Sequence, residues 1–164
     1  MLAFPSGPRS NDRVAIQRAV VGARVTWRTG AIVPRQYGQG RIPAWVTRRM
    51  LGAARIRCAN HYVRPALTLC QKTLALEIQE DARGRFLVLG GALESIHFTD
   101  VTGGFRTRVT ARTVESVRLG RREGAHVTIT VERSTVDWSF VLVKVGRGWR
   151  ISREDFVFAP GTGP

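Results

Sequence analysis

The pattern of apolar and polar positions changes near residue 84 of this chain. Before that point, apolar residues recur every three to four positions, which is the period of an amphipathic helix. After it, apolar and polar residues alternate, which is the period of a half-buried strand. Helices followed by a meander of strands predict an α+β domain whose helices pack on one face of an antiparallel sheet.

Two helices separated by a proline are predicted just before this change. Pro43 suits the first helical position of residues 44–63, and Pro65 ends or kinks that helix before residues 66–79 continue as a second one. Trp45 and Ile56 lie away from the main apolar face of the first helix, so we expect it to pack on two sides. That main face holds Val46, Met50, Ala53, Ala54 and Cys58.

The segment before Pro43 is harder to assign from its pattern. Residues 14–28 fit either a short helix or an extended arm, and residues 29–43 contain several Gly and Pro residues that are typical of a surface loop.

Short strands separated by glycine turns are predicted from residue 84 onward. Gly103-Gly104 marks a hairpin, and the strand after it should turn Phe105, Thr107, Val109 and Ala111 to one face and Arg106, Arg108, Thr110 and Arg112 to the other. The predicted strands are residues 84–91, 93–101, 105–119, 126–134, 137–145 and 149–158.

Large side chains in the last two predicted strands are expected to anchor the core. Trp138 and Phe140 share one face of their strand, as do Trp149 and Ile151 on the next. Cross-strand aromatic pairs of this kind stabilise a sheet beyond simple burial.

Charge is distributed very unevenly along the chain. Residues 1–76 contain 13 Arg or Lys and a single acid, Asp12, whereas residues 77–164 contain 13 basic and 11 acidic residues. Of the 26 basic residues, 24 are Arg, and a guanidinium contacts phosphate through two parallel hydrogen bonds and stacks on bases. A GC-rich genome would also favour arginine codons. The basic first half predicts an RNA-binding surface, with these contact residues: Arg24, Arg28, Arg35, Arg41, Arg48, Arg49, Arg55, Arg57, Arg64, Trp27 and Tyr37.

Residues near the C-terminus resemble a known superfamily. Residues 142–152, LVKVGRGWRIS, are similar to the closing hairpin of the nuclear transport factor 2-like fold, and residues 105–134 and 149–160 resemble a mitochondrial branch of it. That branch comprises the import-motor anchor and a large-subunit ribosomal protein that tethers ribosomes to the membrane. The resemblance implies N-terminal helices on a curved, cone-like sheet over residues 44–160. The expected flanking parts are a basic, extended arm over residues 1–43 and a tail over residues 161–164.

Catalytic and metal chemistry is not expected. The acid–base candidates His97, Asp100, His126, Asp137 and Asp155 show no spacing that would bring two of them together, and no phosphate-binding glycine loop or cluster of metal ligands is present. Cys58 and Cys70 match neither a disulfide framework nor a zinc spacing, and on one continuous helix they would face different ways. We therefore expect buried free thiols in a reducing compartment, with no cofactor.

Two functions remain open. The first is a non-catalytic subunit of a mitochondrial ribosome that binds rRNA and neighbouring subunits, in the matrix or at the matrix side of the inner membrane. The second is an accessory subunit of an inner-membrane complex, with its basic arm against acidic partners or cardiolipin. An isomerase- or dehydratase-like enzyme is a more distant third. Self-repulsion should leave residues 1–42 disordered in isolation, so that their deletion spares the sheet domain but prevents assembly.

Overall fold

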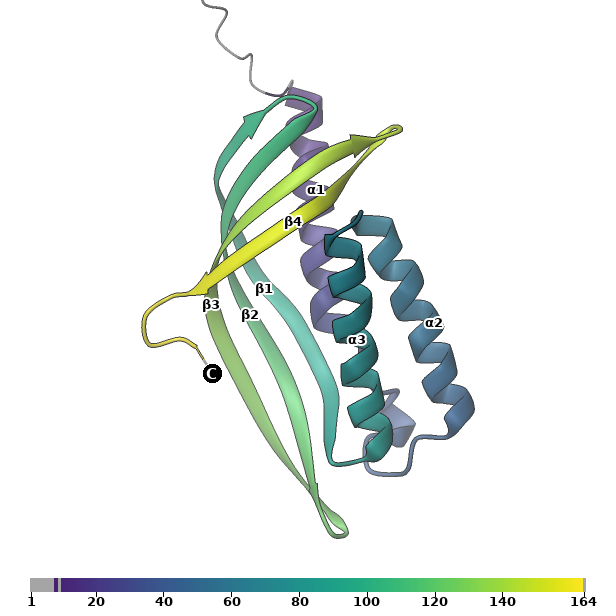
Figure 1. The fold of residues 1–164 in the computed structure, drawn as a ribbon. Coiled ribbons are helices and arrows are strands. Elements are labelled where there is room, and N and C mark those ends of the chain that lie inside the picture. Colours follow the sequence, from purple (N-terminus) through teal and green to yellow (C-terminus); the bar gives the residue numbers. More distant parts are fainter. Residues whose placement is uncertain (1–7, 9, 164) are drawn as a thin grey trace, which may run out of the picture.

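A computed structural model describes residue 8 and residues 10–163 of the chain. Helices come first and strands afterwards along this part of the sequence (Figure 1). The helices are α1 (Ser10–Thr29), α2 (Ala44–His61) and α3 (Ala66–Arg83), with a short 3-10 turn at Arg35–Tyr37. The strands are β1 (Phe86–Gly103), β2 (Arg106–Glu123), β3 (His126–Val145) and β4 (Gly148–Phe158).

The strands form one antiparallel sheet in the order β1-β2-β3-β4, and the helices lie on one side of it (Figure 1). The predicted α+β arrangement is confirmed. The strands predicted at 84–91 and 93–101 form one strand, β1, because it passes through three register shifts without breaking its pairing with β2. Such bulges bend a strand and raise its twist, which suits the curvature of the sheet. The strands predicted at 126–134 and 137–145 likewise join as β3.

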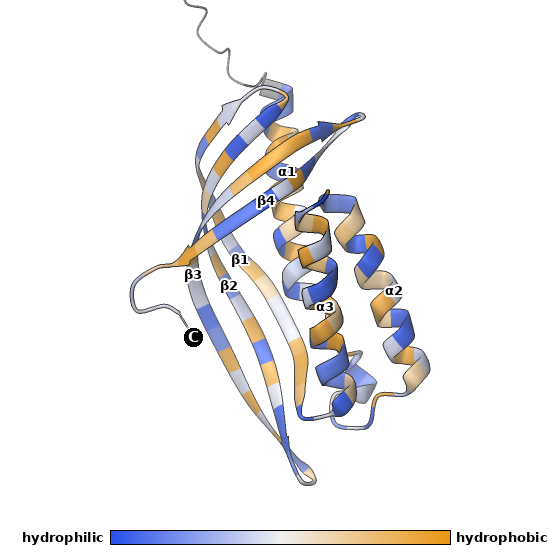
Figure 2. Ribbon diagram, in the orientation of Figure 1, coloured by the Kyte–Doolittle hydropathy of each residue, from blue (hydrophilic) through white to orange (hydrophobic). Residues whose placement is uncertain are grey.

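Alternation along β2 follows the prediction. Thr107, Val109 and Ala111 are buried, Arg106, Arg108 and Arg112 are exposed, and Figure 2 shows the resulting bands of hydrophilic and hydrophobic residues along the strands. Phe105 is the exception, with 88% of its surface exposed. It lies in the turn before β2, where no helix covers it.

The predicted anchors occupy the main core. Phe140 and Ile151 are fully buried, and Trp138 and Trp149 nearly so. The rings of Trp138 and Phe140 stack at 5.5 Å between centroids. These residues pack with apolar residues of all three helices, which confirms the prediction.

The expectation of an extended arm is wrong for the described part of residues 1–43. Residues 10–29 form α1, and Ile16, Val20 and Ala23 are fully buried in the core cluster. Their spacing at i, i+4 and i+7 is that of a helix face, and the basic composition of the surrounding segment obscured it. The packed domain therefore includes α1, and residues 1–7 of the expected arm lie outside the described residues.

Close approach of α1 to the sheet depends on a glycine of β1. A Cβ built on Gly91 would lie 2.0 Å from the backbone oxygen of Arg28. Any larger residue there would push α1 away from β1.

Helices α2 and α3 form a hairpin on the outside of this core. The helix ends before Pro65 as expected, but the chain also reverses direction there, and Val46, Ala54 and Cys58 are buried on α2. Trp45 and Ile56 are 54% and 66% exposed, so among the described residues α2 is not packed on the side that these two residues occupy.

The prediction of two free thiols is also wrong, because Cys58 and Cys70 form a disulfide. That prediction assumed that Cys58 and Cys70 lie on helices that run in the same direction over residues 44–79. Reversal at Pro65 instead places Cys58 on α2 and Cys70 on α3, with their Cα atoms 6.0 Å apart.

Candidate nucleic-acid interface

Seven of the nine predicted RNA-contact arginines have exposed side chains and lie within residues 35–64. None of these exposed arginines forms an ion pair with a carboxylate among the described residues. These exposed side chains are Arg35, Arg41, Arg48, Arg49, Arg55, Arg57 and Arg64, and we call them the arginine surface.

Four of these arginines project from α2 itself. At 100° per residue, Arg48 and Arg55 lie within about 20° of each other on the helix, and Arg49 lies about 100° to one side. The exposed Trp45 and Ile56 fall between these two rows. Arg57 lies farther round, where its Nη1 donates to the backbone oxygen of Thr29 at 3.5 Å.

The face of α2 that carries Arg48, Arg49 and Arg55 is exposed because of where α2 lies in the fold. Helix α2 packs against α3 on the side away from the sheet (Figure 1). The contact uses small buried residues, Ala54 and Cys58, so the opposite face of α2 is uncovered by any described element.

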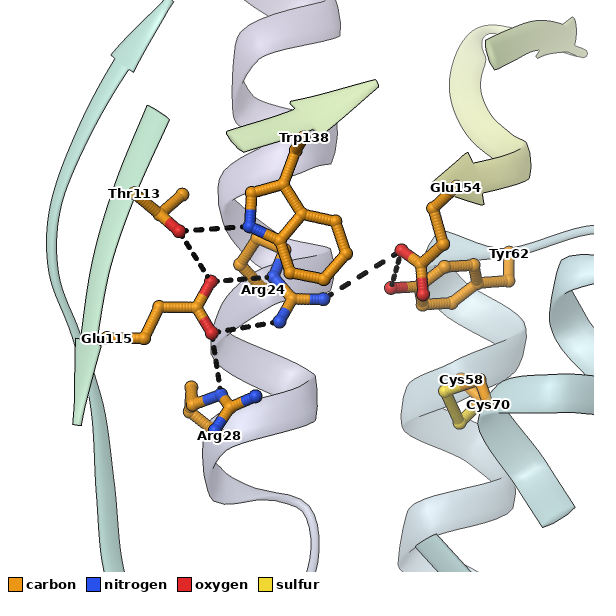
Figure 3. A network of polar contacts seen from close by, with 9 residues as sticks. All are labelled: Arg24, Arg28, Cys58, Tyr62, Cys70, Thr113, Glu115, Trp138 and Glu154. Carbon is orange, nitrogen blue, oxygen red and sulfur yellow. Dashed lines mark hydrogen bonds and ion pairs between the residues drawn. A yellow bond between two sulfur atoms is a disulfide. The ribbon is translucent and has the colours of Figure 1, made fainter. Parts of the chain in front are cut away.

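Arg24 does not belong to this surface, which corrects its assignment as an RNA contact. Its side chain is 1% exposed, and its Nε and Nη2 donate to the two carboxylate oxygens of Glu115 at 3.0 and 2.9 Å (Figure 3). The guanidinium also lies 3.7 Å from the ring centroid of Trp138. A residue enclosed in this way cannot reach a phosphate.

Arg28, Trp27 and Tyr37 are also largely withdrawn from solvent. Arg28 Nε lies 2.7 Å from Glu115, the side chain is 28% exposed, and burial lowers the pKa of its guanidinium. Trp27 packs on the main core, and Tyr37 packs on a smaller cluster that includes Val33. The assignment of Trp27 and Tyr37 as stacking residues is therefore not supported, and Trp45 is better placed for that role.

The network around Arg24 was missed by the sequence analysis. Burial by itself would raise the pKa of Glu115, but hydrogen bonds and charge from Arg24 and Arg28 outweigh it, so the pKa is lowered and the carboxylate stays ionised. Thr113 donates to Glu115 at 2.9 Å and accepts from the indole of Trp138 at 3.0 Å. The sequence feature that indicates this network is an acidic residue, Glu115, at an inward-facing position of β2.

A second buried acid stands on the other side of Arg24. The carboxylate of Glu154 lies 3.9 Å from the Arg24 guanidinium and accepts from the Tyr62 hydroxyl at 3.1 Å (Figure 3). Burial raises the pKa of Glu154, and burial together with Glu154 raises that of Tyr62 well above its usual range.

Arg24, Glu115 and Glu154 line a cavity of about 560 Å³ between α1, α3 and β2–β4. Aromatic residues, among them Trp138, Phe156 and Phe158, line its wall. The carboxylate oxygens of Glu115 already accept hydrogen bonds from Arg24 and Thr113 and form an ion pair with Arg28, so the arrangement stabilises charge on Glu115 rather than leaving it as a free general base.

The other chemical candidates do not converge. His97 and His126 are exposed on different strands. Within residues 10–163, no three His, Cys, Asp or Glu side chains are grouped so as to hold a metal ion. Among the described helices, none combines the length and apolar character needed to cross a membrane.

Comparison with known proteins gives a likeness in fold alone. No protein-family model matches the chain, and no curated protein matches it. Its structure is similar to the crystal structure of the intermembrane space region of the chloroplast protein ARC6, with a TM-score of 0.62 at 15% identity. The likeness covers 93% of this chain and 100% of that one. This neighbour and the helices-on-sheet architecture are compatible with a nuclear transport factor 2-like fold.

Proposed function

We propose that this protein is a non-catalytic structural subunit that binds RNA through the arginine surface on α2 and its flanking segments. The observation that carries the proposal is the set of exposed arginines over residues 35–64 with no ion-pair partner among the described residues. Uncompensated arginines repel one another, and a polyanion removes that repulsion.

RNA fits this surface better than a simple counter-ion does. Each guanidinium forms two parallel hydrogen bonds with a phosphate, and the exposed Trp45 between the arginine rows offers a face on which an unpaired base stacks. Phosphate contacts fix position and carry no base information, so binding of this kind suits folded RNA held by shape.

The finer resemblance leads us to propose a mitochondrial ribosome as the assembly, with rRNA and neighbouring subunits as partners and the matrix as the location. Support comes from the sequence similarity of residues 105–134 and 149–160 to the mitochondrial branch. The Cys58–Cys70 disulfide counts against a reducing matrix location, because disulfides persist mainly in oxidising compartments. Thiol titration of the native protein under denaturing conditions tests it: two reactive thiols support the matrix.

A second candidate is an accessory subunit at an anionic inner membrane. The exposed Trp45 and Ile56 between arginine rows favour it, because aromatic and apolar side chains enter the lipid interface while arginines hold the headgroups.

The experiment measures RNA binding against salt for the full chain and two triple variants. Replacing Arg48, Arg49 and Arg55 by Gln should weaken binding and reduce the slope of log affinity against log salt by about 2 to 3, because three phosphate contacts are lost. The matched control replaces Arg106, Arg108 and Arg118 by Gln, which are exposed on the far side of the sheet.

Equal effects of the two variants would mean that general charge, and not the α2 face, governs binding, and would contradict the proposal. Vesicles with and without cardiolipin separate the two candidates. Binding to cardiolipin vesicles that depends on Trp45 and Ile56, without measurable RNA affinity, would establish the membrane function instead.

A further inference from the structure

The first half of β3 has an unpaired strand edge, whereas the outer edges of β1 and β4 each accept a hydrogen bond from a neighbouring segment. The outer edge of β1 accepts the backbone N–H of Val33 at Val88, at 2.8 Å, and that of β4 accepts the N–H of Val63 at Ile151, at 2.9 Å. Strand β3 pairs with β2 from His126 onward but with β4 only from Val136. Residues 126–134 therefore present a free edge, on which alternate residues turn their backbone N–H and C=O groups outward.

The central part of this edge, residues 127–131, carries no charged side chain or proline that would discourage pairing. Exposed strand edges usually carry lysine, proline or a bulge that discourages a further strand. Residues 127–131 read Val-Thr-Ile-Thr-Val, all with high strand propensity, and β3 shows no register shift against β2 along them. Ile129 is 44% exposed and Val131 67% exposed.

We propose that a second copy of this chain pairs antiparallel with residues 126–132 of β3, forming a two-fold dimer with one continuous sheet. The segment reads the same in both directions about Ile129, so an antiparallel copy places Ile129 opposite Ile129, Thr128 opposite Thr130 and Val127 opposite Val131. Like pairs of β-branched residues are favourable cross-strand neighbours, and a two-fold contact requires a patch that complements itself.

The flanking residues agree with this register. His126 falls opposite Glu132 of the second copy at both ends of the paired segment, so no two acidic side chains face each other across the interface. Glu132 has no ion pair within its own chain among the described residues. The dimer supplies it with a hydrogen-bond donor from His126.

The C-terminal segment restricts the register of the dimer further, because it occupies the edge of β3 beyond residue 134. Ala159 N–H and Thr162 Oγ1 donate to the backbone oxygen of Thr135, at 2.9 and 3.0 Å, so the edge is occupied from Thr135 onward. With Ile129 at the centre, the β2–β3 turn of the second copy, at Gly124 and Ala125, falls opposite residues 133 and 134. Moving the centre one residue toward the C-terminus would drive that turn into the occupied edge.

The test is the mass of the full chain in solution, measured by sedimentation at about 0.3 M salt to screen its net charge of +14. The wild type should reach twice the 18.2 kDa of one chain at micromolar concentration. Ile129→Lys should weaken the dimer about tenfold, because two lysines then face each other at the axis. Val157→Lys, at a 70% exposed position on β4, is the matched control and should leave it unchanged.

Mixing Ile129→Lys with Ile129→Glu should restore a dimer, since the axis then joins opposite charges. That rescue depends on residue 129 facing residue 129 and is not expected from a general effect on folding. A monomeric wild type, a dimer indifferent to Ile129→Lys, or a mixture that stays monomeric would each overturn the proposal. In the first case, the edge is left for a strand of a different protein.

Discussion

Arg24 shows how one side chain ties the N-terminal helix to the sheet. Its guanidinium is buried between the carboxylates of Glu115 and Glu154 and lies over the ring of Trp138. A buried charge is tolerated when its hydrogen bonds and counter-charge are complete, and it becomes very unfavourable when a partner is removed. The arrangement therefore makes the docking of α1 specific.

Glu115→Gln should lower the free energy of unfolding by about 3–5 kcal/mol. The amide keeps the shape of the side chain but leaves Arg24 and Arg28 without their shared counter-charge. Urea denaturation measures the loss. Glu94→Gln removes an exposed ion pair with Arg133 and serves as the control, with little change expected.

Asp81 on α3 is a buried acid with an incomplete set of partners. One carboxylate oxygen accepts the backbone N–H of Val88 at 2.9 Å, while the other is buried without a hydrogen-bond partner. Burial raises the pKa of this carboxyl to about 7, against the lowering effect of the Val88 N–H.

Stability should consequently fall as the pH rises from about 4 to about 7. In this range the folded state holds a proton on Asp81 that the unfolded state has released, so raising the pH favours unfolding. Asp81→Asn should remove this dependence and be more stable than the wild type at pH 8, by about 1–2 kcal/mol. Urea melts at pH 5 and pH 8 test it, with the more exposed Glu80→Gln as control. Equal pH dependence in Asp81→Asn and the wild type would contradict it.

The burial of a residue could be predicted where it follows from the alternation of its close neighbours in the sequence. Trp138 and Trp149 follow from strand alternation alone, because the inward face is set by neighbours two residues away. The burial of Arg24 could not be predicted, since its partner Glu115 is 91 residues distant. An arginine in a basic segment gives no local sign of that partner.

At the scale of elements, the disulfide joins the α2–α3 hairpin and not one helix to itself. It closes a short loop, with a sequence separation of 12 between Cys58 and Cys70. The break at Pro65 was predictable from proline chemistry, but the direction of the chain beyond it was not. That unknown direction accounts for the error on the thiols.

Replacing Cys58 and Cys70 together by Ala should cost about 2–3 kcal/mol of stability, mainly because the unfolded chain gains freedom. Thermal or urea unfolding of the double variant and the oxidised wild type measures the difference. Wild type kept reduced should behave like the double variant. If oxidised and reduced wild type unfold at the same urea concentration, the cross-link contributes nothing.

At the scale of the whole molecule, the Arg-rich first half has two separate roles. Its inward residues on α1 complete the core, and its outward residues from Arg35 to Arg64 form the arginine surface. Composition predicted a basic surface but could not divide the arginines between the two roles. That division depends on which face of each helix meets the sheet.

Deletion of residues 1–42 should therefore unfold the sheet domain, contrary to the expectation from composition. It removes Ile16, Val20 and Ala23 from the core and leaves Glu115 buried without Arg24. Circular dichroism and amide NMR of the truncated chain test this. A folded truncated sheet would show that α1 is dispensable.

A pair of substitutions on α1 separates this effect from the loss of basic charge. Val20→Asp places an acid in the core and should be strongly destabilising, whereas Val14→Asp, at a 47% exposed position, should be nearly neutral. Similar melting temperatures for the two variants would contradict the inward role of α1.

The separation between Arg24 and Glu115 also sets an order of events during synthesis. The helix segment that carries Arg24 leaves the ribosome first, and 91 more residues must be added before Glu115 is made. At about 5–20 residues per second, that takes roughly 5–18 s. During this interval α1 is a nascent, basic, amphipathic segment with no sheet to bury its apolar face. A chaperone or the anionic surface of the ribosome itself is expected to bind this segment until β1 and β2 have been synthesised.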